Sequence, residues 1–204
     1  MLPCGEHAVL LELDGTPSAL GVARALRLDP PDGVLEIVPA ARTVLVRFDP
    51  TRTTAQALGP RLLAMRPVDP ADDDTAAIIV PTVYDGADLD HVADLTGLHR
   101  DEVVRRHGAV TYTVAFIGFA PGFAYLTGGD PQLVVPRRSA PRSAVPAGAV
   151  ALAGEYCGIY PRRSPGGWQL VGHTSLAVFD PAADPPTPFA PGTRVRFEAR
   201  GPDA

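Results

Sequence analysis

The chain has 204 residues, of which 46% are hydrophobic and 20% charged, a composition typical of a globular protein with one large or two small domains. All 18 basic residues are arginine, which excludes a Schiff-base lysine and the lysine of a Walker A phosphate-binding loop. The formal net charge of −5 without a long basic stripe predicts no nucleic-acid partner, and no apolar stretch approaches the roughly 20 residues that span a bilayer.

The sequence begins with a predicted strand followed by a predicted helix. Residues 7–15, "HAVLLELDG", are apolar and rich in residues that favour strands. The next segment has apolar residues at helical spacing, with Thr16 as the expected N-cap and Pro17 at the first helical position.

Two short strands and a second helix are predicted next. Residues 33–50 contain two β-rich runs around a Pro-Ala-Ala-Arg turn, and residues 51–65 favour a helix that Gly59 and Pro60 are expected to interrupt. The order βαββα over residues 1–75 predicts a small α+β domain of ferredoxin type.

An acidic linker, "VDPADDD" at residues 68–74, precedes a further predicted strand over residues 75–84. That strand either completes the small N-terminal sheet or begins a second domain, expected over residues 76–204. Residues 85–108 then favour two short helices, because apolar residues recur there at helical spacing.

The second half of the chain predicts an all-β unit. Short strand-like runs alternate with connections rich in proline and glycine, the pattern of a closed or nearly closed barrel. The clearest runs are residues 110–119, 149–154, 168–179 and 193–199. The 23 prolines concentrate in the connections, so these loops are expected to be rigid and extended.

Arginines and glycines in these loops indicate a site for an anionic ligand. Between Pro131 and Leu170 the only acidic residue is Glu155, against five arginines. Guanidinium groups bind carboxylate or phosphate bidentately, and the amides of a Ser-Pro-Gly-Gly turn form an anion nest. The candidate contacts are Arg137, Arg138, Arg142, Arg162, Arg163, Ser164, Gly166 and Gly167. Solvated arginines in ordinary turns are the alternative.

The segment "GFAPGFAYL", residues 118–126, interrupts an apolar run with two glycines and a proline. We expect it to form one wall of the site, with Gly122 allowing close backbone approach to a ligand. On this hypothesis a Gly122→Val substitution abolishes turnover and leaves the fold intact. Tyr125 and Tyr160 are candidates for orienting a substrate, whereas Phe116, Phe119 and Phe123 are expected in the core.

Among the histidines, His107 and His173 are the candidates for contact with a substrate, and His107 is the candidate for proton transfer. The five histidines show no metal-ligand spacing, so no metal site is predicted in this chain. The two cysteines, Cys4 and Cys157, are expected to be free thiols, and with no signal-peptide pattern we expect a cytoplasmic protein.

The ordered segments "GFAPGFAYL", "DPQLVVPRRSAPRSAVPAGAVALAG", "GIYPRRSPGGWQLVGHT" and "FAPGTRVRFEA" resemble the family that contains the B subunit of the prokaryotic ATP-dependent 5-oxoprolinase. The same family is known as allophanate hydrolase subunit 1, the C/D subunit of the carboxyltransferase domain, or KipI-type kinase inhibitor. The resemblance covers nearly the whole chain. It departs at residues 154–157, "GEYC", where relatives have Gly-Gly-Gln-Thr, and at His173, where they have arginine.

The resemblance implies a small α+β domain followed by a cyclophilin-like β-barrel. It also implies a partner, the related C subunit, with which the B subunit uses ATP and magnesium to phosphorylate the amide oxygen of 5-oxoproline. The separate A subunit of the same complex then opens the ring to glutamate, and the isolated chain is expected to be inactive. Both a lactam carboxylate and the phosphates of ATP suit the arginine-rich loops.

Two other functions stay open at this point. One is a carboxyltransferase-like protein that acts on urea or another small amide, with biotin delivered by another protein because this chain has no lysine. The other is an inhibitor of a histidine kinase, a binding function that needs no C subunit. Prolyl isomerase activity is a weaker inference, since a cyclophilin-like fold by itself does not define the chemistry.

Overall fold

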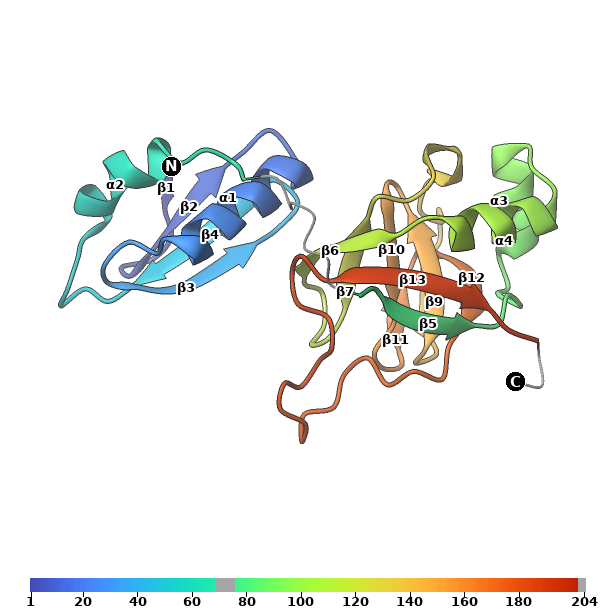
Figure 1. The fold of residues 1–204 in the computed structure, drawn as a ribbon. Helices are drawn as coiled ribbons and strands as arrows, with labels where there is room; N and C mark the ends of the chain where they lie inside the picture. The colour runs from blue at the N-terminus through green and yellow to red at the C-terminus, as the bar shows by residue number, and fades with distance from the viewer. Residues whose placement is uncertain (69–75, 202–204) are drawn as a thin grey trace. The chain divides into compact units, whose positions relative to one another are not determined.

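The computed structural model describes residues 1–68 and 76–201, and the chain divides into two compact units, Met1–Asp74 and Thr75–Ala204 (Figure 1). Helices and strands occur in both units, which confirms the expected α+β class. The expected domain boundary and most of the acidic linker before it fall on residues 69–75, outside the described residues. Among the described residues, no helix has the length and apolarity needed to cross a bilayer.

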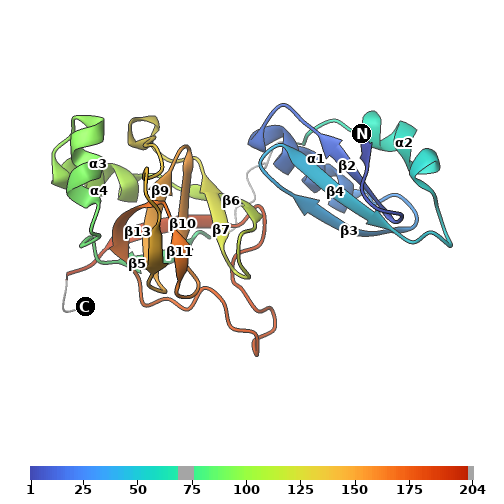
Figure 2. The ribbon, with the colours of Figure 1, turned by 180° about the vertical axis from the view of Figure 1, so that it is seen from behind.

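The first unit is an antiparallel sheet packed against helices. The strand order is β1 (Leu2–Pro3), β2 (Ala8–Glu12), β4 (Thr43–Phe48), β3 (Val34–Pro39), and the helices are α1 (Thr16–Leu28) and α2 (Ala55–Leu63). In Figure 1, α1 lies across one face of this sheet, and Figure 2 shows the opposite face. Side chains such as Val9, Leu26 and Val46 fill the space between helix and sheet. The order β2-β4-β3 is that of a ferredoxin-like sheet, and β1 occupies the edge beside β2.

Two details of the helices differ from expectation. Gly15, not Thr16, is the N-cap of α1, and the Thr16 hydroxyl donates to the carbonyl of Ala41 at 3.1 Å instead. Pro60 lies inside α2 without ending it. The burial of Leu58 and Leu62 on one face of α2 provides the packing that offsets the lost backbone hydrogen bond.

The second unit is a seven-stranded, nearly closed barrel. The strand order is β12 (Gln169–His173), β9 (Ala149–Ala153), β10 (Tyr156–Ile159), β7 (Ala124–Thr127), β6 (Tyr112–Ile117), β13 (Arg194–Ala199), β5 (Ile78–Thr82). A backbone bridge between Val83, after β5, and His173, at the end of β12, brings the two edges together. The expected strand over residues 75–84 therefore belongs to the barrel, where it pairs in parallel with β13.

The alternation of side chains along the barrel strands separates two clusters. Val150 and Leu152 of β9 point into the barrel, together with residues of α3 (Leu89–Thr96) and α4 (Arg100–Ala109). Ala151 between them faces the other side, where β8 (Arg142–Val145) and β11 (Ser164–Gly166) form a separate two-stranded sheet. Because side chains alternate along a strand, β9 contributes to two clusters: the core inside the barrel, and a second cluster outside it that contains Phe123, Tyr160 and Trp168.

Gly172 permits the barrel to close, because a Cβ there would overlap the carbonyl oxygen of Val83 and lie 3.2 Å from Tyr84 Cα. We therefore expect Gly172→Ala to lower the free energy of unfolding of the second unit by about 1–3 kcal/mol. Thermal denaturation monitored by circular dichroism measures this. Gly118→Ala is the matched control, since its Cβ would make only ordinary contacts of 3.7 Å or longer. Equal melting temperatures for the two variants would contradict the expectation.

Candidate anion-binding site

A buried carboxylate organises the arginine-rich loops of the second unit. Asp88 precedes α3 and is 2% exposed. Its Oδ1 accepts from Arg142 Nη2 at 2.7 Å and from Arg138 Nη1, and its Oδ2 accepts from the backbone N–H of Leu170 at 2.8 Å. We call Asp88, Arg138 and Arg142 the Asp88 cluster. The cluster joins the start of a helix to a loop and to β8, and the Leu170 contact ties it to the barrel strand β12.

The Asp88 cluster carries one negative and two positive charges. Burial raises the pKa of Asp88, but hydrogen bonds from Arg142 and from the Leu170 N–H, with the charges of Arg142 and Arg138, outweigh burial and hold this pKa below its usual range. The carboxylate is therefore ionised at neutral pH. Since it balances only one guanidinium, a net charge of +1 remains in a partly buried place.

Several buried polar atoms near the Asp88 cluster have no hydrogen-bond partner among the described residues. They are Arg138 Nε, Arg142 Nη1, Ser164 Oγ and Gln169 Oε1. The β8–β11 pair places Gly166 opposite Arg142 and Ser164 opposite Val145, and the Arg138 N–H donates to the carbonyl of Gly167 at 2.8 Å. Gln169 Oε1 is an acceptor, but the two guanidinium nitrogens are donors and the Ser164 hydroxyl can donate. Buried donors without acceptors are costly, and an anionic oxygen would satisfy them. The net charge and these free donors both favour an anionic ligand.

An aromatic group borders the arginines: Phe123, Tyr125, Tyr160 and Trp168, which lie on or beside β7, β10 and β12. Its ring centroids are 5.1 Å apart for Phe123 and Tyr160, 5.2 Å for Phe123 and Trp168, and 5.4 Å for Tyr125 and Trp168. These rings pack edge to face, and this packing holds the Tyr125 and Tyr160 side chains in fixed positions beside the arginines.

Arg137 lies near both tyrosines. Burial raises the pKa of Tyr125 and of Tyr160, and the positive charge of Arg137 opposes this rise at each phenol. Arg137 is exposed, as are Arg162 and Arg163 in the loop between β10 and β11. The structure thus brings Tyr125, Tyr160 and Arg137 together, with Arg162 and Arg163 in the exposed loop just before β11.

The three glycines predicted in the site have different surroundings. A Cβ on Gly166 would lie 2.8 Å from Tyr160 Cζ, whereas one on Gly167 would meet Pro141 at an ordinary 3.5 Å. Gly122 has a φ of +78°, and its Cβ would lie 2.8 Å from Phe179 Cγ. Gly122 is therefore required by the chain's own packing, and Gly122→Val would disturb the fold. The expectation of an intact fold was wrong.

Phe119 also differs from expectation. It has a φ of +66°, and it is 62% exposed, although its ring stays 5.4 Å from that of Phe123. The other two phenylalanines of the segment, Phe116 and Phe123, are buried as expected. The left-handed turn at Phe119 directs this side chain outward. Residues 174–179, expected to extend a strand, are not part of one, and Phe179 packs against Gly122.

The two candidate histidines lie outside the Asp88 cluster. His107 is fully buried on α4, with Nδ1 2.7 Å from the Tyr84 hydroxyl and Nε2 3.3 Å from Cys157 Sγ. Burial lowers the pKa of His107 to about 3, so the ring is neutral at physiological pH. His173 is exposed at the end of β12, where Nδ1 lies 2.8 Å from Asp85 Oδ1. Neither position adjoins the free guanidinium donors.

Asp88 was not identified from the sequence. An aspartate before a helix is ordinarily read as an N-cap, but here the side chain makes no cap hydrogen bond. Its partners are up to 82 positions away in the chain. The cysteines are as expected: both are free, Cys4 exposed and Cys157 buried. No group of three or more His, Cys, Asp or Glu side chains within the described ranges is placed to hold a metal ion.

The fold is that of a carboxyltransferase-type protein. Residues 1–189 match the family described as "Carboxyltransferase domain, subdomain C and D". The chain belongs to this family.

Individual relatives show which members of this family the chain is similar to. The chain is 41% identical over 203 residues to the B subunit of 5-oxoprolinase from Escherichia coli O157:H7, an alignment that covers 95% of this chain and 92% of that protein. The crystal structure of TTHA0988 is similar with a TM-score of 0.79 and 39% identity, over 96% of this chain but only 41% of that one. Urea amidolyase of K. lactis shares the fold at 20% identity, with a TM-score of 0.70 over 97% of this chain and 14% of that one.

Proposed function

We propose that the chain is the B subunit of an ATP-dependent 5-oxoprolinase, and that the Asp88 cluster binds an anionic group of the substrate or the nucleotide. The name of the Escherichia coli relative supports the role. The observation that carries the site is the partly buried excess positive charge, with the buried atoms Arg138 Nε and Arg142 Nη1 left without acceptors among the described residues. The carboxylate of 5-oxoproline or a phosphate of ATP would satisfy these donors.

The proposed reaction requires groups that the A and C subunits supply. A phosphoryl group passes from ATP to the amide oxygen of 5-oxoproline, ADP leaves, and water opens the activated ring to glutamate and phosphate with the A subunit. In this chain the arginines would position and neutralise the anion, since there is no lysine to do so. Magnesium would accompany the phosphates of ATP, as the resemblance implies. The greater length of the TTHA0988 chain, of which this one spans 41%, is consistent with such a second unit.

The test is to mix this chain with A and C subunits encoded by genes adjacent to its own. Phosphate release that depends on ATP and 5-oxoproline is then measured, with one component omitted at a time. Loss of release whenever this chain is omitted supports the proposal. Phosphate release that is unaffected by omitting it would refute the proposal. Turnover of urea with a biotin carrier protein, and none of 5-oxoproline, would favour the carboxyltransferase alternative.

In the reconstituted complex we expect Arg138→Ala to raise the KM for 5-oxoproline or for ATP by about tenfold or more, because a charge-assisted contact is lost. Steady-state kinetics with each substrate varied separately identifies which ligand the arginine binds. The matched control is Arg196→Ala on β13, an exposed arginine whose ion-pair partner is Glu198. If both variants keep the parent KM values, Arg138 is not a contact residue.

A further inference from the structure

A concave site apart from the Asp88 cluster lies at one end of the barrel. It is a cavity of about 290 Å³ between the ends of β6, β7, β9 and β10 and the short helix η1 (Pro131–Leu133). We call it the end cavity. Its volume is close to the lower limit of about 300 Å³ for ligand pockets, so it suits a molecule of fragment size. No arginine of the Asp88 cluster lines it.

Tyr112 lines the end cavity and is 1% exposed, and its hydroxyl has no hydrogen-bond partner among the described residues. A Cβ on the neighbouring lining residue Gly129 would lie 3.0 Å from Tyr112 Cε1 and 3.5 Å from the hydroxyl oxygen. The glycine therefore leaves room beside the ring. A buried hydroxyl without a partner is unfavourable, and a ligand that pairs with it removes that penalty.

Cys157 is another lining residue of the cavity, and its thiol ends a buried polar chain. Cys157 Sγ lies 3.3 Å from His107 Nε2, and His107 Nδ1 lies 2.7 Å from the Tyr84 hydroxyl. Burial raises the pKa of both Cys157 and Tyr112, so thiol and phenol are uncharged at physiological pH. The floor of the cavity is thus polar and neutral.

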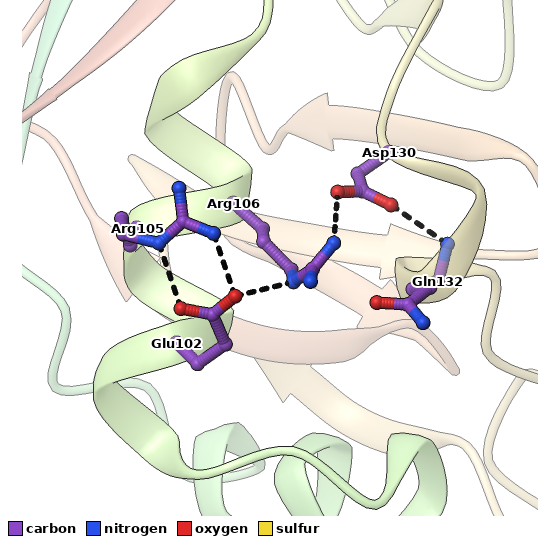
Figure 3. Close-up of polar contacts among 5 residues, drawn as sticks. All are labelled: Glu102, Arg105, Arg106, Asp130 and Gln132. Carbon is purple, nitrogen blue, oxygen red and sulfur yellow. Dashed lines mark hydrogen bonds and ion pairs between the residues drawn. The ribbon is translucent and has the colours of Figure 1, made fainter.

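The charged residues that line the end cavity are Asp130 and Glu155, both acidic. Asp130 already accepts from Arg106 Nη1 at 2.9 Å and from the Gln132 N–H at 2.9 Å, as Figure 3 shows. An anion would be repelled, and a cation would compete with Arg106 for Asp130. The remaining lining includes Leu133, Val134 and Leu152, which favour an apolar body.

We propose that the end cavity binds a small uncharged molecule with an apolar body and one hydroxyl or carbonyl group, and that the Tyr112 hydroxyl is its hydrogen-bond partner. The site is separate from the anion-binding site and does not depend on the proposed function. Its ligand class follows from the neutral floor, the apolar wall and the acidic rim.

Three compounds that share a cyclopentane ring but differ in charge test the class of ligand. Cyclopentanol, cyclopentanecarboxylate and cyclopentylammonium are titrated into the full-length isotope-labelled chain, and the backbone amide shifts of Gly128, Gly129 and Cys157 are followed by NMR. We expect saturable shifts with cyclopentanol and weaker or no response with the two ions. Absence of saturable shifts up to the solubility of the alcohol overturns the proposal, as does tighter binding of either ion.

Two tyrosine variants test the contact. Tyr112→Phe removes the hydroxyl that lines the cavity and is expected to weaken cyclopentanol binding about fivefold or more, without lowering the melting temperature, because no existing hydrogen bond is lost. Tyr84→Phe is the matched control. It removes a hydroxyl bonded to His107, so it is expected to lower the melting temperature and to change binding less than about twofold. Unchanged affinity in Tyr112→Phe would refute the assigned contact.

Discussion

Asp88→Asn is expected to destabilise the second unit by about 3–5 kcal/mol, because it leaves two partly buried guanidinium groups without a counter-charge. Asp88 is 2% exposed, and both Arg138 and Arg142 donate to the same oxygen. An asparagine keeps the shape but replaces one carboxylate oxygen with a donor, which opposes either an arginine or the Leu170 N–H. Urea denaturation followed by the fluorescence of Trp168, the single tryptophan of the chain, measures the loss within this unit.

The matched control is Asp90→Asn, two residues further on, in the first turn of α3. Asp90 forms an ion pair with Arg100 at 3.0 Å, but its side chain is 77% exposed. Exposed pairs contribute roughly 0–1 kcal/mol, so this variant should unfold at nearly the same urea concentration as the parent. Similar losses in the two variants would mean that the Asp88 cluster does not anchor the loops.

The same carboxylate predicts a dependence of stability on pH. The folded-state pKa of Asp88 lies below its ordinary value, so the unfolded chain binds the proton more readily at low pH. The stabilisation is therefore complete above the ordinary aspartate pKa and is lost as the pH falls through the lowered folded value. In the Asp88→Asn variant, the free energy of unfolding should therefore fall less as the pH is lowered, because the Asp88 contribution is absent. Parallel stability curves for parent and variant between neutral and acidic pH would contradict it.

Gly166→Ala is expected to reduce kcat/KM of the reconstituted complex by about 100-fold, because displacing a site residue by about 1 Å has effects of that order. The new Cβ would overlap the Tyr160 hydroxyl, which accepts from the backbone N–H of Trp168. Tyr160 is 1% exposed and is held among Phe123 and Trp168, so β11 must move instead. That movement would shift Ser164 and alter the pairing with Arg142.

Gly167→Ala is the control for this prediction. Its Cβ would make contacts of 3.5 Å and longer with Pro141, which are ordinary van der Waals distances. Activity within about twofold of the parent is expected, because such a small change leaves β11 in place. If the two alanine variants are equally active, the position of β11 does not control turnover. Circular dichroism of each variant separates a local shift from loss of the fold.

Most of the secondary structure was predictable from the sequence because periodicity is a local property. The helices α3 and α4 and the β-hairpin of β3 and β4 lie where apolar spacing and turn residues indicated. Predictions from local sequence were wrong at positions where tertiary packing determines the contact or the helix boundary. Thr16 resembles an N-cap, yet its hydroxyl is bonded to Ala41 O, and Pro60 does not end α2 because the apolar face of the helix is buried.

For the candidate site, the sequence determined which chemical groups were present: arginines without lysine, glycines that permit close approach, and tyrosines in proline-rich loops. Only the tertiary structure decided how they combine. Asp88 meets Arg138, Arg142 and Leu170 across 50 to 82 positions of chain, and no local pattern encodes contacts at that separation. Burial of one carboxylate beside two guanidinium groups is a property of the packed barrel, because desolvation and charge pairing exist only after distant segments have come together.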